Sequence, residues 1–219
     1  MKKSFLLAAI ASIIATGLAS FAGATRAQDA NAGAKKVDMC IGCHDIPGYK
    51  GSFPEIYRVP KIAGQNAKYI VAALGEYKKG DRKHPSMRAI AAALSDQDMG
   101  DVAAYYEQLG KGEAAAATPP PPPGSVAKLL AQAACVACHG ANFSKPIDPS
   151  YPKLAGQYSD YLYAALKAYQ TQGNPHIGRN NAIMMGMARP FTHVEIKEIA
   201  AYLSSLPGEI RTVQLPEFR

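Results

Sequence analysis

The chain has 219 residues, 48% of them hydrophobic and 19% charged, with a formal net charge of +7 at pH 7. Three of its cations, Lys2, Lys3 and Arg26, lie in an N-terminal segment that we expect to be removed, and without them the net charge falls to +4. So modest a positive charge does not indicate a nucleic-acid partner. No stretch beyond the N-terminal segment is long and apolar enough to cross a bilayer, which excludes a membrane-spanning mature protein.

The N-terminus has the three parts of a secretory signal peptide. Two lysines follow the first methionine, an apolar run extends from Phe5 to about Ala22, and small residues then offer cleavage after Ala24 or Ala27. The run nearly reaches the length of a membrane span, so an uncleaved anchor is the alternative. Threonine, serine and glycine lower its apolarity, which favours a cleaved signal peptide at 1–27. We therefore expect a periplasmic protein that contacts the membrane only peripherally or through partners.

All four cysteines of the chain belong to two copies of Cys-x-x-Cys-His. The two copies comprise Cys40, Cys43 and His44, and Cys135, Cys138 and His139. This pentapeptide is typical of c-type haem attachment, in which two thioethers hold the porphyrin and the histidine ligates iron. One zinc ion bound by all four cysteines and two short cystines are the alternatives, and neither explains the adjoining histidines. We therefore predict two covalent haem c groups, whose propionates bring the charge of the holoprotein close to zero.

An internal repeat divides the chain into two units of the same architecture. The sequence Pro-Lys-Ile-Ala-Gly-Gln at 60–65 recurs as Pro-Lys-Leu-Ala-Gly-Gln at 152–157, and the offsets between matching features stay between 92 and 97 residues. We assign domain 1 to 28–111 and domain 2 to 125–206. The two repeated segments are predicted to position the start of the next helix and to wall the haem.

Helical patterns predict an all-α fold for each domain, and no strand pattern is convincing. The first helix of each domain runs from about Asn31, or from about Ser125, into its haem motif. Apolar residues then recur at helical spacing after each repeated segment. The last helix begins with a capping box, at Ser95 in domain 1 and at Thr192 in domain 2. With only about eighty residues in each domain, we expect the haem to complete the core.

Two segments lie outside the domains. The linker at 112–124 contains an alanine tetrad and five consecutive prolines, which cannot form a helix and favour an extended polyproline II spacer. The tail at 207–219 is predicted to be either a docking segment or disordered.

A second axial ligand would close the open face of each haem and leave electron transfer as its chemistry. Met87 and Met184 each lie eight residues before a capping box, so they occupy equivalent positions downstream of the haem motifs. Methionine sulfur is a soft ligand that raises the reduction potential. We predict Met87 and Met184 as the sixth ligands, with Met185 as the alternative in domain 2. Otherwise Met185 and Met187 are expected to pack beside the haem.

Three further residues lie close to the predicted methionines. His84 is the alternative ligand in domain 1, but the matching position in domain 2 is Asn181. Arg82 and Arg179 do match, each five residues before the predicted methionine. They are predicted either to pair with a haem propionate or to be solvated loop residues, and the sequence favours neither.

In these features the chain resembles the dihaem cytochrome c4 family. The resemblance rests on the paired haem motifs, repeated segments and methionines, together with the stretch at 94–105, and it extends to about Leu206. It implies two class I cytochrome c domains, each with histidine and methionine on iron, that carry electrons in the bacterial periplasm. In that family the carrier is not an enzyme, and it serves a respiratory chain between a quinol-oxidising cytochrome bc complex and a haem-copper terminal oxidase.

Two features depart from the family pattern. The proline linker is longer and stiffer than the compact linker usual there, which leaves open how closely the haems are coupled, and the tail at 207–219 is additional. Both slightly favour a second function, the dihaem electron-accepting subunit of a periplasmic dehydrogenase of flavocytochrome or quinoprotein type. A dihaem peroxidase or gas-binding protein would need an open iron face, which two equivalent methionines argue against.

Overall fold

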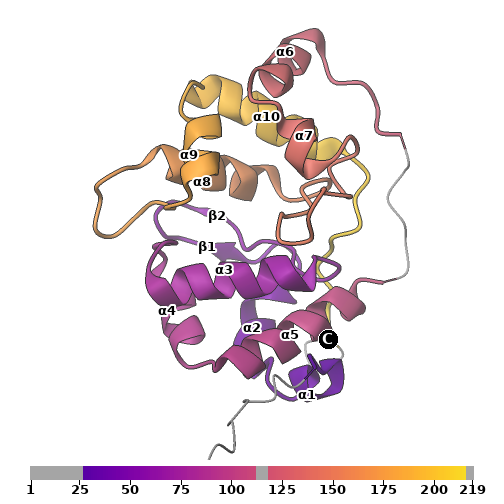
Figure 1. Cartoon of the computed structure of the whole chain (residues 1–219), viewed down its shortest axis with the longest axis vertical. Helices are drawn as coiled ribbons and strands as arrows, with labels where there is room; N and C mark the ends of the chain where they lie inside the picture. The colour runs from indigo at the N-terminus through magenta and orange to yellow at the C-terminus, as the bar shows by residue number, and fades with distance from the viewer. Residues whose placement is uncertain (1–26, 112–117, 216–219) are drawn as a thin grey trace, which may run out of the picture.

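The computed structural model describes residues 27–111 and 118–215 and contains two helical domains stacked one on the other (Figure 1). The predicted signal peptide, apart from its last residue, lies outside the described residues. Domain 1 contains α1 (Ala30–Ala34), α2 (Asp38–His44), α3 (Ala67–Lys79), α4 (Pro85–Ala92) and α5 (Asp96–Leu109). Domain 2 contains α6 (Gly124–Gln132), α7 (Cys135–His139), α8 (Ser159–Gln170), α9 (Ala182–Ala188) and α10 (His193–Ser205). No helix within the described ranges is long and apolar enough to cross a membrane.

Each domain is built around its last helix, as the periodicity predicts. In domain 1, α5 packs on α1 and α3 and buries Met99 and Tyr106, and in domain 2, α10 packs on α6 and α8 and buries Ile196. Burying one such side chain contributes about 1.5–3 kcal/mol. Both predicted capping boxes are present, at Ser95 and Thr192, where each hydroxyl and the acidic residue three positions later satisfy each other's backbone N–H. The two-domain, mainly helical fold is confirmed.

The first helix of each domain is interrupted before the haem motif, whereas the sequence pattern predicts one continuous helix. In domain 1, α1 ends at Ala34 and α2 begins only at Asp38, because the intervening turn directs Val37 into the core with 3% of its surface exposed. In domain 2, Ala134 adopts a left-handed conformation, with φ of 46°, between α6 and α7. Periodicity does not reveal such breaks, since no glycine or proline marks them.

A short hairpin is the second difference from the all-α expectation. Strand β1 (Lys50–Gly51) pairs antiparallel with β2 (Tyr57–Arg58) in the loop after the first haem motif. The hairpin lies against α8 of domain 2, where the Arg58 guanidinium donates to Asp160 at 2.9 Å and Lys167 donates to Glu55 at 2.9 Å. The hairpin therefore belongs to the contact between the domains.

The two repeated segments bind each other across the domain boundary. The side-chain amide of Gln65 donates to Lys153 O at 3.0 Å and accepts from Lys153 N at 2.9 Å. Gln157 repeats this arrangement with Lys61, donating to its carbonyl at 2.9 Å and accepting from its N–H at 3.0 Å. The domains are thus related by an approximate twofold that runs through the repeated segments. The sequence prediction for these segments was incomplete, because it did not include a contact between them.

The linker prolines lie near domain 2 where the structure describes them. Tyr202 donates its hydroxyl proton to Pro120 O at 3.0 Å. Pro123, with φ of −51° and ψ of 149°, is close to polyproline II geometry. Because the domains bind each other directly, their arrangement does not depend on the stiffness of this linker.

Two candidate haem sites

Both haem motifs lie on short helices, which set the relative directions of their side chains. In α2 the two cysteines and the histidine occupy positions i, i+3 and i+4, which share one face of a helix. The same spacing recurs in α7. All four thiols are free and half-buried: Cys40, Cys43, Cys135 and Cys138. Each domain therefore presents two thiols and one imidazole on the same side of a single helical turn.

The proximal histidines are oriented by the repeated segments. His44 Nδ1 lies 2.9 Å from Pro60 O, and His139 Nδ1 lies 3.1 Å from Pro152 O. Burial lowers the pKa of both imidazoles, although the proline carbonyl acts in the opposite direction, so both are neutral at pH 7. A neutral ring that donates from Nδ1 keeps the Nε2 lone pair available for a metal. The expectation that these segments support the haem site fits this geometry.

The two predicted methionines lie in equivalent positions, each on a short helix. Met87 is in the first turn of α4, and Met184 is in the first turn of α9. The N–H of Met87 donates to His84 Nδ1 at 3.3 Å, and the N–H of Met184 donates to the side chain of Asn181 at 3.1 Å. His84 is therefore the N-cap of the methionine-bearing helix, and its match with Asn181 reflects this shared task.

This capping role is not evident from the sequence, because histidine is a rare N-cap. The available signal is an acceptor side chain three residues before each methionine. Because His84 Nδ1 accepts from the backbone, this geometry supports methionine over histidine as the ligand in domain 1. Met87 also packs against the core of domain 1, as does Cys40.

The remaining candidates are less well placed. Met185 is half-buried and Met187 is 41% exposed, and packing of both beside the haem stays a prediction. Within the described ranges, no three His, Cys, Asp or Glu side chains gather to hold a metal ion, so the single zinc site is not formed. Burial raises the pKa of the Cys40 thiol to about 11, which also disfavours a zinc thiolate at neutral pH.

Arg82 and Arg179 meet at the boundary between the domains. Their backbones form an antiparallel bridge. Arg82 donates to the Tyr69 hydroxyl at 3.1 Å, and Arg179 donates to the Tyr161 hydroxyl at 3.0 Å. Each guanidinium is therefore held by a tyrosine hydroxyl of its own domain. Arg82 is only 5% exposed, so the prediction of a solvated loop arginine is wrong for this residue.

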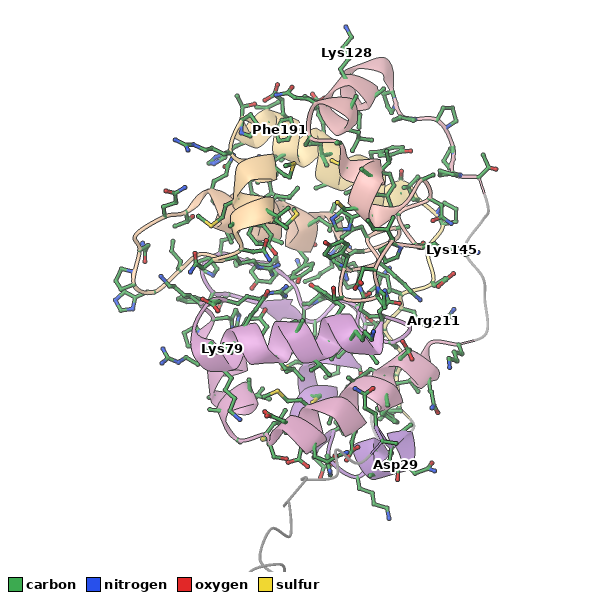
Figure 2. The ribbon with its side chains drawn as sticks, in the orientation of Figure 1. Asp29, Lys79, Lys128, Lys145, Phe191 and Arg211 are labelled. Atoms are coloured by element: carbon green, nitrogen blue, oxygen red, sulfur yellow. The ribbon has the colours of Figure 1, made fainter. Side chains whose placement is uncertain are left out.

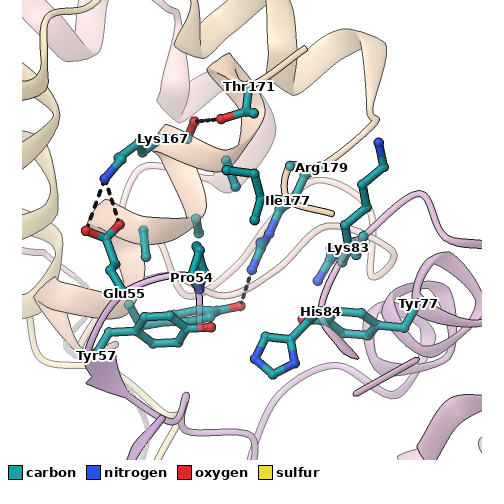
Figure 3. A pocket seen from close by; sticks show the side chains of 16 residues that line it. Pro54, Glu55, Tyr57, Tyr77, Lys83, His84, Lys167, Thr171, Ile177 and Arg179 are labelled. Carbon is teal, nitrogen blue, oxygen red and sulfur yellow. Dashed lines mark hydrogen bonds and ion pairs between the residues drawn. The ribbon is translucent and has the colours of Figure 1, made fainter. Parts of the chain in front are cut away.

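Positive charge is concentrated at this meeting point of the two arginines. Arg82 forms an ion pair with Glu76, whereas Arg179 is held by the hydroxyl of Tyr161 and by the faces of tyrosine rings. Figure 3 shows Arg179 entering a cavity beside His84 and Lys83. A buried guanidinium needs an anionic partner. A haem carries two propionates, so this surplus of charge, five residues before each methionine, fits the group that the motifs predict.

Comparisons with known proteins agree with the two-site geometry. The sequence model described as Cytochrome c matches residues 30–110 and 125–207. Cytochrome c4 of Stutzerimonas stutzeri is 30% identical over 205 residues, covering 87% of this chain and 93% of the relative. A thiosulfate dehydrogenase electron acceptor from Stutzerimonas stutzeri (strain A1501) is 34% identical over 185 residues, covering 80% and 82%. The crystal structure of reduced recombinant cytochrome c4 from Pseudomonas stutzeri is 28% identical, with a TM-score of 0.62, covering 82% of this chain and all of that one.

Proposed function

Because this chain belongs to the dihaem cytochrome c4 family and binds two covalent haem c groups, we propose that it carries electrons in the periplasm from a quinol-oxidising cytochrome bc complex to a haem-copper terminal oxidase. Proteins of this family transfer electrons and are not enzymes. The observation that carries the proposal is the duplicated support of each site, in which a proline carbonyl fixes the histidine and a helix cap fixes the methionine. A signal peptide at 1–27 would supply the export that periplasmic work requires.

Each haem would be held by residues that the two domains supply in the same order. The attaching and ligating residues are Cys40, Cys43, His44 and Met87 in domain 1, and Cys135, Cys138, His139 and Met184 in domain 2. When bound, haem iron supplies one-electron chemistry between its ferrous and ferric states. The protein's part is to keep the imidazole neutral and oriented, through the carbonyls of Pro60 and Pro152. Ligands that do not move between redox states keep reorganisation small.

The arginines and tyrosines at the boundary would neutralise the haem propionates. Arg82 and Arg179 approach from opposite domains, and Tyr69 and Tyr161 hold both guanidiniums in place. Anchored propionates at the boundary would bring the facing edges of the two haems to the same polar region. A carrier that holds two electrons in one rigid body follows from this arrangement.

A second candidate is the electron-accepting subunit of a periplasmic dehydrogenase. It is favoured by one observation, the 34% identity to a protein named thiosulfate dehydrogenase electron acceptor over most of both chains. On this alternative the same two sites receive electrons from a catalytic chain instead of from a quinol-oxidising complex.

Reduction kinetics separate the two candidates. The ferric holoprotein is mixed with purified cytochrome bc complex and quinol, and separately with thiosulfate and thiosulfate dehydrogenase, and the haem absorbance is followed. The respiratory proposal predicts rapid reduction in the first mixture and re-oxidation on addition of the terminal oxidase. Reduction only in the second mixture, with co-purification of the catalytic chain, would overturn it in favour of the dehydrogenase.

A further inference from the structure

The described part of the tail, 207–215, runs from domain 2 back onto domain 1. Leaving α10, it first passes the repeated segment of its own domain so closely that a Cβ on Gly208 would lie 1.9 Å from Ala155 O. Ile210 is then buried, with 4% of its surface exposed. Arg211 finally donates its backbone N–H to Ala63 O, in the repeated segment of domain 1, at 2.9 Å. Figure 2 shows Arg211 near the boundary, beside the N-terminal end of α3.

Side chains fasten the tail to both domains. Glu209 forms an ion pair with Lys153 at 2.6 Å, and the side chains of both residues are largely buried. Lys153 also donates to Gly64 O at 2.8 Å, so it links the tail, its own domain and domain 1. Val213 packs against the core of domain 1. The described tail is therefore ordered against both domains, which corrects the expectation of disorder for 207–215.

The tail has room for this path only because two glycines stand where it crosses the repeated segments. Gly64 has φ of +81°, and a Cβ there would lie 2.5 Å from Glu209 O. Gly208 lies just as close to the repeated segment of domain 2, in the way that Gly110 does in domain 1. Ala63 accepts the hydrogen bond from the tail. It lies three residues after Pro60, whose carbonyl orients His44. The tail thus contacts the segment that supports the proximal histidine of domain 1.

We propose that 207–215 is a clasp that locks domain 1 onto domain 2 and thereby sets the rate at which the two haems exchange electrons. The repeated segments bring the domains together, and the clasp closes over their junction and prevents the domains from opening. Its backbone bond to Ala63 adds a second contact from domain 2 to the domain 1 segment that Gln157 binds at Lys61. The clasp acts whatever the redox partner, so its failure and the failure of the proposed respiratory function are separate outcomes.

The test compares two substitutions at one position. Arg211→Pro removes the N–H that donates to Ala63, whereas Arg211→Ala keeps that N–H and removes only the side chain. Haem–haem electron exchange is measured by NMR in the half-reduced holoprotein, and opening of the boundary is measured by hydrogen exchange of the Lys61 and Lys153 amides, which donate across it. We expect Arg211→Pro to open the boundary about fivefold more often, the factor expected for one backbone hydrogen bond, and to slow electron exchange. Arg211→Ala should open the boundary less often than Arg211→Pro, because the backbone bond to Ala63 remains.

Truncation after Leu206 tests the whole clasp. We expect it to open the boundary more than tenfold more often, since it removes the ion pair and the burial of Ile210 as well. Both haems should remain attached, with unchanged ligand spectra, because the clasp contributes no ligand. Unchanged electron exchange and hydrogen exchange after truncation would overturn the proposal. Equal effects of Arg211→Pro and Arg211→Ala would also overturn it, because the backbone bond would then play no part.

Discussion

Domain 1 and domain 2 have the same architecture, and comparing them shows which positions need the same residue in both and which accept different ones. Within the repeated segments, the residues that bind across the boundary are unchanged, since each of Gln65, Gln157, Lys61 and Lys153 must match its partner about the twofold. The caps of the methionine helices differ, because any side chain with a suitably placed acceptor satisfies the same N–H. The same residue is thus required where the two copies of a segment contact each other. Where a side chain acts only within its own domain, any residue with a suitable hydrogen-bond acceptor suffices.

The largest expected effect comes from replacing Arg82 and Arg179 one at a time, because the two arginines have different partners. Arg82→Ala leaves Glu76 without its partner, and we expect the free energy of unfolding to fall by about 3–5 kcal/mol. Arg179→Ala removes a bond to a neutral hydroxyl and should cost about 1–3 kcal/mol. Guanidinium unfolding of the holoprotein measures both, with the exposed Arg189→Ala as control, at about 0–0.5 kcal/mol. Equal losses for Arg82→Ala and Arg179→Ala would show that the ion pair does not distinguish the domains.

Next in size is the loss of one cross-domain glutamine. Gln65→Ala and Gln157→Ala each leave a backbone N–H and a carbonyl unpaired at the boundary, at an expected cost of about 1–3 kcal/mol. Because the contacts are related by the twofold, the two losses should agree within about 0.5 kcal/mol. The same unfolding experiment measures them, and the exposed Gln132→Ala serves as control. A loss from one glutamine alone would mean that the boundary is asymmetric.

The cap exchange tests both the comparison and the choice of ligand. His84→Ala should cost about 0.5–2 kcal/mol, whereas His84→Asn, which copies domain 2, should cost almost nothing. Asn181→Ala is the matched loss in domain 2. Unfolding measures the caps, and ferric absorption measures the ligands. If His84→Asn produced a high-spin haem and left the sulfur-to-iron band unchanged, histidine and not Met87 would be the ligand.

The smallest effect is a difference in acid stability. Lys36 and the Ser95 cap lower the pKa of Asp98 from 3.8 to about 2. A carboxyl whose pKa is lower in the folded state stabilises the fold above its unfolded pKa, and this stability is lost as the pH falls from 3.8 through about 2. In domain 2 the pKa of the capping carboxyl of Glu195 is lowered by its hydrogen bonds with Thr192 alone, without the contribution of a lysine. Lys36→Gln should therefore flatten the acid unfolding curve of domain 1 and leave that of domain 2 unchanged, as followed by haem-resolved NMR.

The sequence predicted the features that depend on near neighbours. Helical periodicity placed α3 and α8, and the capping boxes placed the starts of α5 and α10. The equivalent register of Met87 and Met184 followed from counting back from those caps. These signals lie within a few residues of the structure that they describe, so one sequence suffices to find them.

The features that the sequence did not reveal depend on contacts far along the chain. Gln65 binds Lys153, 88 residues away, so the repeated segment gave no sign that it would meet its own copy. The tail likewise reaches Ala63 from Arg211. The break before the first haem motif has another reason, because burial of Val37 overrides a local pattern that favours a continuous helix.

The most direct test of the central claim, histidine and methionine on iron in each domain, is the sulfur-to-iron charge-transfer absorption of the ferric holoprotein. It is measured in the parent protein, in Met87→Ala, in Met184→Ala and in the double variant. The account predicts that each single variant loses about half of the band and the double variant loses all of it, with both haems still attached through their cysteines. A full band in Met87→Ala, or an unchanged spectrum in Met184→Ala, would contradict it.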